Sequence, residues 1–147
     1  SDVIFNNYNI ENGDMMIICS NSGRNAMPIE MAQRCKKEGV FTVAITNLEQ
    51  SKQCLSRHHS GKKLYECADL VLDNCVPFGD ALLDIDGIQT GPGSSISSMF
   101  ILNTAVSEAI RICKDEGIEV NVFQSQNVDG FNNDKIYDKY RNRVKHI

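Results

Sequence analysis

Residues 15–25 read MMIICSNSGRN, an apolar run that passes directly into a short polar turn. The run at 15–19 has the length and composition of a buried strand, and a helical pattern follows over residues 26–38. In an open α/β sheet, ligands bind just beyond the carboxyl ends of strands, where a turn leads into a helix. The turn after residue 19 is therefore the first candidate for a binding site.

This turn has the chemistry of a phosphate site. Ser20 and Ser22 supply hydroxyls, and Gly23 lets the backbone approach a ligand closely. The start of the next helix adds unpaired N–H groups and a partial positive charge. Arg24 is placed either to contact the anion or to point into solvent. The alternative is an ordinary tight turn in which Asn25 only caps the helix, and composition alone leaves both interpretations open.

The segments that follow predict a strand–helix–strand unit. The helix over 26–38 has Pro28 in its first turn, where the missing N–H costs nothing, and Gly39 ends it. Residues 41–46, FTVAIT, are nearly continuously apolar or β-branched, which is typical of a strand buried on both faces of a parallel sheet. The fold class is therefore α/β with a mainly parallel sheet.

The rest of the chain alternates polar loops with shorter periodic segments. Residues 47–63 predict a polar loop or an irregular helix, and the further expected elements are a short helix at 64–68, strands at 70–72 and 81–85, a long helix at 95–116, an extended piece at 120–123 and a helix at 133–144. The strand at 81–85 is expected at an edge of the sheet, because its polar content is higher. A second small-residue turn at 91–95 offers Ser94 or Ser95 as the N-cap of the long helix.

Composition excludes several classes of partner. The 147 residues suit one domain with its own core. A net charge of −4, with a pI near 5.3, does not indicate the basic surface that binds nucleic acid or an anionic membrane. No apolar stretch approaches the roughly 20 residues that span a bilayer. We therefore expect a cytoplasmic protein with no nucleic-acid and no membrane partner.

The six cysteines are widely spaced, with no C-x-x-C pair. This spacing favours reduced, structural cysteines over a disulfide framework. It also gives no metal site, since the only close Cys or His pair is His58-His59, and adjacent residues rarely both ligate one ion. No metal and no cofactor are expected.

At this point the sequence resembles a known family. The segment 20–25, SNSGRN, placed after a buried strand, is similar to the S-x-S-G-x-T signature of SIS (sugar isomerase) domains, which bind phosphosugars on a flavodoxin-like sheet. The segments 44–49, 56–62 and 79–81 and the Gly/Ser turn before the long helix follow in the order found in a group of uncharacterised bacterial SIS-domain proteins classed as phosphosugar isomerases. This resemblance covers about residues 13–130.

The resemblance implies a set of phosphosugar-binding residues. The matching positions in the signature are Ser20, Ser22, Gly23, Arg24 and Asn25. Asn25 departs from the signature, which usually has Thr there, although its side chain can still cap or donate. On the opposite side of the pocket the resemblance implies Ser94 and Ser95.

The resemblance also implies a reaction, aldose–ketose isomerisation, which needs a base within about 3 Å of a carbon-bound proton. Phe100 falls where one group of these isomerases carries its histidine, so the base must lie elsewhere. Candidates are His58, Glu108 and Asp80; His58 and Glu108 are our predicted catalytic residues. His58 is preferred because its ordinary pKa suits proton transfer, whereas Glu108 is as readily an exposed or paired structural acid.

The resemblance finally bears on domain organisation. SIS domains usually begin with another helix and a strand that ends in a Gly/Ser turn, and residues 1–13 resemble neither. We therefore expect a three-layer SIS sandwich lacking that strand and helix, with 1–13 as a connection, 14–117 as the core and 118–147 as a C-terminal extension. The exposed sheet edge and apolar surface predict a homodimer or higher homo-oligomer.

Two functions remain open from the sequence. The first is a phosphosugar isomerase that acts on an open-chain sugar phosphate by proton transfer. The second is a non-catalytic sugar-phosphate sensor that signals through its dimer. Binding of a flavin mononucleotide is the weaker third possibility, because aromatic residues that would flank the flavin ring are not evident near either turn.

Overall fold

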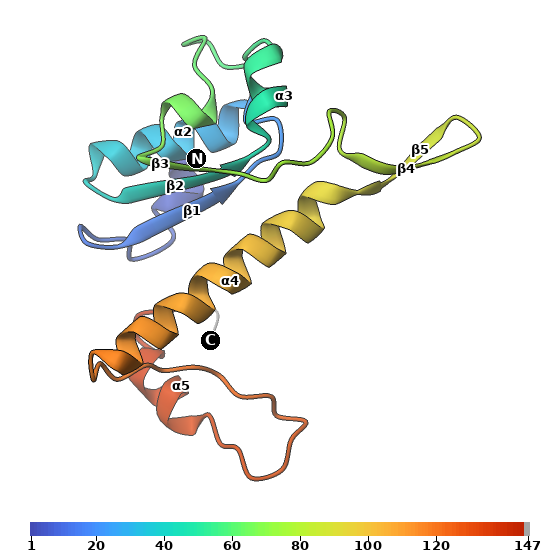
Figure 1. The fold of residues 1–147 in the computed structure, drawn as a ribbon. Coiled ribbons are helices and arrows are strands. Elements are labelled where there is room, and N and C mark those ends of the chain that lie inside the picture. Colours follow the sequence, from blue (N-terminus) through green and yellow to red (C-terminus); the bar gives the residue numbers. More distant parts are fainter. Residues whose placement is uncertain (146–147) are drawn as a thin grey trace.

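A three-stranded parallel sheet carries the fold in this computed structural model, which describes residues 1–145 (Figure 1). The sheet consists of β1 (Met15–Cys19), β2 (Phe41–Thr46) and β3 (Leu70–Asp73), in that order. Its register places Ile17 beside Val43, and Val43 beside Leu70. The predicted α/β class with a parallel sheet is confirmed, and the bounds expected for β1 and β2 match those observed.

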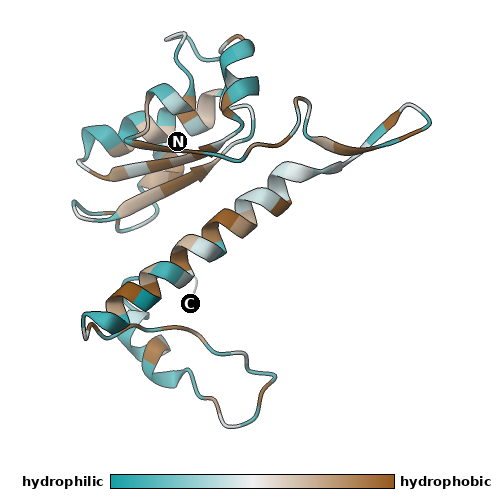
Figure 2. Cartoon of the chain, viewed as in Figure 1, coloured by the Kyte–Doolittle hydropathy of each residue, from teal (hydrophilic) through white to brown (hydrophobic). Residues whose placement is uncertain are grey.

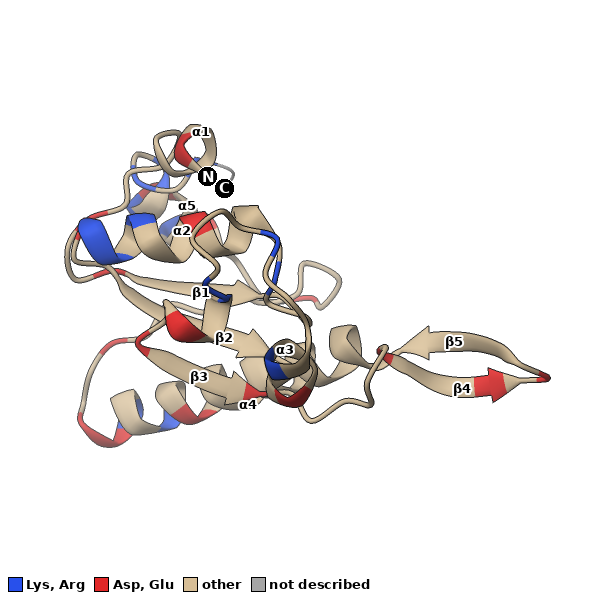
Figure 3. Cartoon of the chain, turned by 90° about the horizontal axis from the view of Figure 1, so that it is seen from above, with Lys and Arg blue, Asp and Glu red and all other residues tan. Residues whose placement is uncertain are grey.

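Helix α2 (Ala26–Lys37) covers one face of the sheet and builds the core there. Its Ile29 and Ala32 pack with Ala44 of β2 and with Leu64 of the short 3-10 helix η1 (Leu64–Glu66). Full burial of side chains such as Ile29 and Leu64 is worth about 1.5–3 kcal/mol each. Lys and Arg gather in the last turn of α2, where they complement the helix dipole (Figure 3).

Two short helices complete this side of the molecule. Helix α1 (Asp2–Phe5) lies within the segment expected to be a connection, and its Phe5 packs into a second cluster with Met31, Cys35 and Val40. Helix α3 (Leu48–Gln53) follows β2 inside the polar segment 47–63, and the Asn47 side chain accepts a hydrogen bond from the Gln50 N–H to cap it.

The prediction that the strand at 81–85 lies at an edge of the main sheet is wrong. Strand β4 (Ala81–Ile85) does form, but it pairs antiparallel with β5 (Ile88–Pro92) in a separate hairpin that projects from the body of the molecule (Figure 1). The turn between them is Asp86-Gly87, with φ of 52° and 86°. Asp-Gly is a favoured pair for a two-residue hairpin turn with both residues at positive φ, and this local preference sets the pairing.

Helix α4 (Gly93–Asp115) passes on the side of the sheet opposite α2 (Figure 1). It begins two residues earlier than predicted, and its N-cap position is Pro92 rather than Ser94 or Ser95. The expected apolar face is present as brown segments along the helix (Figure 2), yet Ile96 is 67% exposed and Phe100 is 72% exposed. The sheet face toward α4 also leaves Ile17 and Leu70 partly exposed.

The length of α4 corrects one sequence expectation. By length and composition alone, α4 could cross a membrane, so the statement that no segment approaches that length is wrong. A core helix of a soluble protein passes the same test, but such a helix is mostly buried, whereas this part of α4 is not. Beyond α4 the described chain contains α5 (Asp134–Tyr140), which is shorter than the helix predicted at 133–144, while the expected extended piece at 120–123 joins no strand.

Candidate functional site

The turn at 20–25 is held tight by its own backbone and by the elements behind it. The Gly23 N–H donates to the Ser20 carbonyl at 3.1 Å, and Gly23 has a φ of 55°, in the left-handed region. A Cβ at this position would lie 3.0 Å from Ser51 Oγ, 3.1 Å from Thr46 Oγ1 and 3.3 Å from Leu64 Cβ. Glycine is therefore required here both for the backbone conformation and for the close packing.

Asn21 connects this turn to the ends of the other two strands. Its carbonyl accepts hydrogen bonds from Thr46 Oγ1 at 2.9 Å and from the Asn47 N–H at 2.8 Å, both at the end of β2. Its side-chain oxygen accepts from Asn74 Nδ2 at 2.9 Å, directly after β3. The three carboxyl ends are thus fastened to one another, which is the edge where open α/β sheets bind ligands.

A pocket of about 360 Å³ opens where the end of β1 meets the start of α4. Its lining residues come from these two elements: Cys19, Ser20, Asn21, Ser94, Ser95, Ser98, Met99 and Leu102. Among the residues that the structure describes, the hydroxyls of Ser20, Ser95 and Ser98 have no hydrogen-bond partner, so they are available to a ligand. The lining includes one titratable side chain, Cys19, and burial raises the pKa of its thiol.

Asp80 fixes the helix that forms the other wall of the pocket. Its carboxylate accepts hydrogen bonds from the Ser94 N–H and from the Ser94 hydroxyl, both at 2.6 Å, and its carbonyl accepts from the Gly93 N–H at 2.8 Å. The first N–H groups of a helix need such acceptors. The sequence predicted that Ser94 or Ser95 caps α4. Asp80 caps the helix instead, because its side chain reaches the start of α4 from the loop before the hairpin.

The remaining signature residues lie on the other side of the turn and do not line this pocket. Ser22 is half-buried, and its hydroxyl has no partner among the described residues. Asn25 directly precedes α2, but its side chain makes no capping hydrogen bond with that helix. Instead Asn25 Oδ1 accepts from Arg57 Nη1 at 3.3 Å, which brings the loop at 54–63 to the turn.

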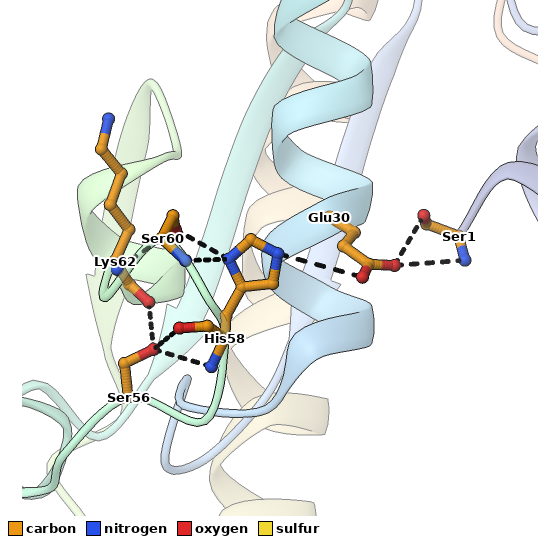
Figure 4. A network of polar contacts seen from close by, with 6 residues as sticks. All are labelled: Ser1, Glu30, Ser56, His58, Ser60 and Lys62. Atoms are coloured by element: carbon orange, nitrogen blue, oxygen red, sulfur yellow. Dashed lines mark hydrogen bonds and ion pairs between the residues drawn. The ribbon is translucent and has the colours of Figure 1, made fainter.

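His58 lies in a different environment from the pocket. Its side chain is buried against α2, with Nδ1 2.7 Å from Ser60 Oγ and Nε2 3.9 Å from Glu30 Oε1 (Figure 4). Glu30 also accepts a hydrogen bond from the Ser1 hydroxyl at 3.0 Å. His58 thus joins the loop to the first half of α2 and is not part of the pocket lining.

Glu108, the other predicted base, lies on the exposed side of α4. Arg111 binds it through Nη2 at 2.6 Å and through Nε at 3.0 Å. These hydrogen bonds hold the pKa of the Glu108 carboxyl below its ordinary value. The residue borders a separate hollow on α4 together with Phe100 and Asn103. Glu108 and His58 are brought neither to the pocket nor to each other, and their catalytic roles stay predictions.

Sequence reasoning missed Asn21, Asn74 and Ser98. Ser98 was accessible in principle, because it follows Ser94 and Ser95 at helical spacing and therefore shares their face of α4. Asn21 lies within the quoted turn, where the sequence analysis assigns it no role, and Asn74 gives no local signal. No cluster of His, Cys, Asp or Glu in the described part of the chain could hold a metal ion.

Comparison with known proteins finds a family match for the first part of this chain. Residues 1–47, which contain β1, the signature turn, α2 and β2, match the family model described as the SIS domain. Relatives are UPF0309 proteins, at 38% identity in Caldanaerobacter subterraneus subsp. tengcongensis over 99% of this chain and at 41% in Halalkalibacterium halodurans over 90%. Residues 1–47 are therefore similar to SIS domains, and the chain as a whole is similar to UPF0309 proteins.

This chain spans only part of the length of these relatives. This chain spans 61% of the Caldanaerobacter protein and 57% of the Halalkalibacterium protein. A further UPF0309 protein, from Geobacillus thermodenitrificans, is 41% identical over 92% of this chain, which spans 56% of it. The residues matched to the SIS domain contain the signature turn with β1 and β2, and the activity of the whole protein is a matter for proposal.

Proposed function

We propose that this chain binds a phosphorylated sugar between the turn at 20–25 and the first turns of α4. The observation that carries the proposal is the convergence of three unpartnered hydroxyls, those of Ser20, Ser95 and Ser98, in one pocket. Hydroxyls that donate and accept hydrogen bonds suit the alternating donors and acceptors of a sugar. The apolar side chains of Met99 and Leu102 supply a surface for the sugar carbons.

The phosphate end of the ligand is assigned to the turn itself. The Ser22 hydroxyl and the backbone at Gly23, Arg24 and Asn25 lead into α2, whose first N–H groups and dipole favour an anion. No acidic residue occupies the first turn of α2, so nothing there opposes a phosphate. An open-chain sugar phosphate would extend from this helix start to the hydroxyls of the pocket.

The reaction that we propose for the whole protein is aldose–ketose isomerisation. A base removes the proton from C2 of the open-chain aldose, and an enediolate forms. The proton of the C2 hydroxyl passes to the C1 oxygen, the C2 oxygen becomes the ketone carbonyl, and the base returns its proton to C1. His58 remains the favoured base and Glu108 the second candidate. Both lie outside the pocket lining, so either residue can act only if a movement of its own segment, or a second copy of the chain, brings it to the bound sugar.

A non-catalytic sugar-phosphate sensor is the second candidate, and one observation favours it. The described lining of the pocket holds neither a carboxylate nor an imidazole, while proton abstraction needs a base within hydrogen-bond reach. A binding module needs only the hydroxyls and the helix start. The two candidates share the ligand and differ in whether the C2 proton is exchanged.

Solvent exchange separates the two candidates. The protein is incubated in D₂O with hexose, heptose and N-acetylhexosamine 6-phosphates, and deuterium at C2 is followed by mass spectrometry. Exchange with one sugar phosphate supports the isomerase, and its loss in His58→Ala with unchanged binding supports His58 as the base. Unchanged exchange in His58→Ala removes that assignment, and Glu108→Gln then tests the second. Tight binding without exchange supports the sensor.

We further propose that two copies associate in the cytoplasm through the surface formed by α4 and the nearby sheet face. The exposed Ile96 and Phe100 on the helix, with Ile17 and Leu70 on the sheet, support this proposal, since contiguous exposed apolar surface usually marks an interface. Sedimentation of the wild type and of Phe100→Ser tests it. A monomeric wild type would contradict it, and so would a Phe100→Ser dimer as strong as that of the wild type.

A further inference from the structure

The arginines of this chain fall into two groups. In the part of the chain that the structure describes, four arginines pair with carboxylates: Arg34, Arg111, Arg141 and Arg143. The two that pair with no carboxylate there are Arg24 and Arg57. In a protein of net charge −4, unpaired arginines are not explained by a shortage of acidic partners.

The two unpaired arginines lie together. The backbone N–H of Arg57 donates a hydrogen bond to the backbone carbonyl of Arg24 at 2.8 Å. The Arg57 guanidinium donates through Nη1 to Asn25 Oδ1 at 3.3 Å. Asn25 is the residue from which α2 starts. The loop at 54–63 therefore carries a second guanidinium to the same helix start that Arg24 precedes in sequence.

Unpartnered buried atoms adjoin the same turn. Arg24 Nε is buried and has no hydrogen-bond partner. Ser51 is fully buried, its Oγ is also unpartnered, and this hydroxyl packs directly beneath Gly23. Polar atoms left unpaired in this way are costly and call for an explanation. The Ser51 hydroxyl faces the back of the turn, beside Thr46 and Leu64. The Arg24 guanidinium, which has no carboxylate partner among the described residues, is the group that a bound anion at the turn would satisfy.

We propose that Arg57 binds the phosphate group of the ligand together with Arg24, at the N-terminus of α2. Guanidinium groups present planar pairs of N–H donors that match phosphate oxygens, and such charged hydrogen bonds are stronger than neutral ones. Arg57 thereby becomes a specificity residue for phosphorylated over unphosphorylated sugars. This inference rests on the proposed sugar-phosphate function and adds a residue from outside the signature turn.

The test compares phosphate affinity among matched variants. Dissociation constants for inorganic phosphate, fructose 6-phosphate and fructose are measured by calorimetry for the wild type, Arg57→Ala, Arg57→Lys and Arg141→Ala. Arg141 is an exposed arginine paired with Asp138 and serves as the control. We expect Arg57→Ala to weaken binding of both phosphates about tenfold or more, with Arg57→Lys between it and the wild type. Arg141→Ala should bind as the wild type does, and any affinity for fructose should stay unchanged.

The outcomes separate this inference from the function on which it rests. Binding of fructose 6-phosphate that is equal in wild type and Arg57→Ala overturns the role of Arg57 and leaves the proposed function standing. Arginine-dependent binding of inorganic phosphate, with no gain for any sugar phosphate, supports the arginine pair and counts against the sugar ligand. A wild type that binds neither phosphate overturns the inference, and an equal loss in Arg141→Ala reduces it to a general effect of charge.

Discussion

Replacing Gly23 by alanine tests whether the turn is built as described. The new Cβ would meet Ser51 Oγ at 3.0 Å and Thr46 Oγ1 at 3.1 Å, with Leu64 Cβ at 3.3 Å. Left-handed backbone costs a non-glycine residue about 1–2 kcal/mol, and overpacking a tight site costs about 1–3 kcal/mol more. We therefore expect Gly23→Ala to lower the free energy of unfolding by about 2–5 kcal/mol.

Gly61 supplies the matched control for this substitution. It also has positive φ, at 71°, but no heavy atom lies within 4 Å of the position where its Cβ would stand. Gly61→Ala should therefore lose only the backbone part, about 1–2 kcal/mol. Urea unfolding of both variants isolates the packing term as their difference. Equal losses in the two variants would refute the close packing beneath the signature turn.

Further predictions concern the helix start, a surface carboxyl and the thiols. Asp80→Ala should lower the free energy of unfolding by about 1–2 kcal/mol in urea, because the start of α4 loses its capping acceptor. NMR titration should find the pKa of Glu108 below its ordinary value, and Arg111→Ala should raise it. Cys75, which is exposed, should react rapidly with a thiol reagent, whereas Cys35 should react slowly because burial shields it and raises its pKa.

Each of these three predictions has a control variant or a result that would contradict it. Asp129→Ala removes an exposed loop acid with no described partner and should leave stability nearly unchanged. A stable Asp80→Ala variant would contradict the capping role. Since the pKa of Glu108 is lowered in the folded state, its contribution to stability is present above the unfolded pKa and is lost as pH falls through the folded pKa. If the pKa of Glu108 is the same in the wild type and in Arg111→Ala, the Glu108–Arg111 contact is contradicted. If Cys75 and Cys35 react at equal rates, the burial of Cys35 is contradicted.

The sheet and α2 could be predicted because their signals are local. The apolar run at 15–19 and the β-branched run at 41–46 each determine a strand from their own residues, and Gly39 ends the helix between them. Strand β4 shows the opposite case. Its own residues indicate a strand but not a partner, and the partner is set by the Asp86-Gly87 turn that follows it.

The site could be predicted only in part, for the same reason. Ser20 was found because it ends a strong strand signal, and Ser94 and Ser95 were found by resemblance. The contacts that bring them together, made by Asn21, Asn74 and Asp80, join segments distant in sequence, and no local pattern indicates such pairs. Arg57 shows this most clearly, because its place beside the turn depends on the whole path of the loop at 54–63.

The most direct measurement is a thermal-shift titration with hexose, heptose and N-acetylhexosamine 6-phosphates on the wild type, Ser20→Ala and Ser107→Ala. At 100 times the dissociation constant, binding stabilises the fold by about 2.7 kcal/mol. A tenfold weaker site in Ser20→Ala would retain about 1.4 kcal/mol at the same concentration. Ser107, exposed on α4 outside the pocket, should behave as the wild type does. A melting temperature raised by one sugar phosphate, with a smaller rise in Ser20→Ala alone, is the predicted result; no rise with any of them, or an equal rise in all three proteins, would contradict a sugar-phosphate site in this pocket.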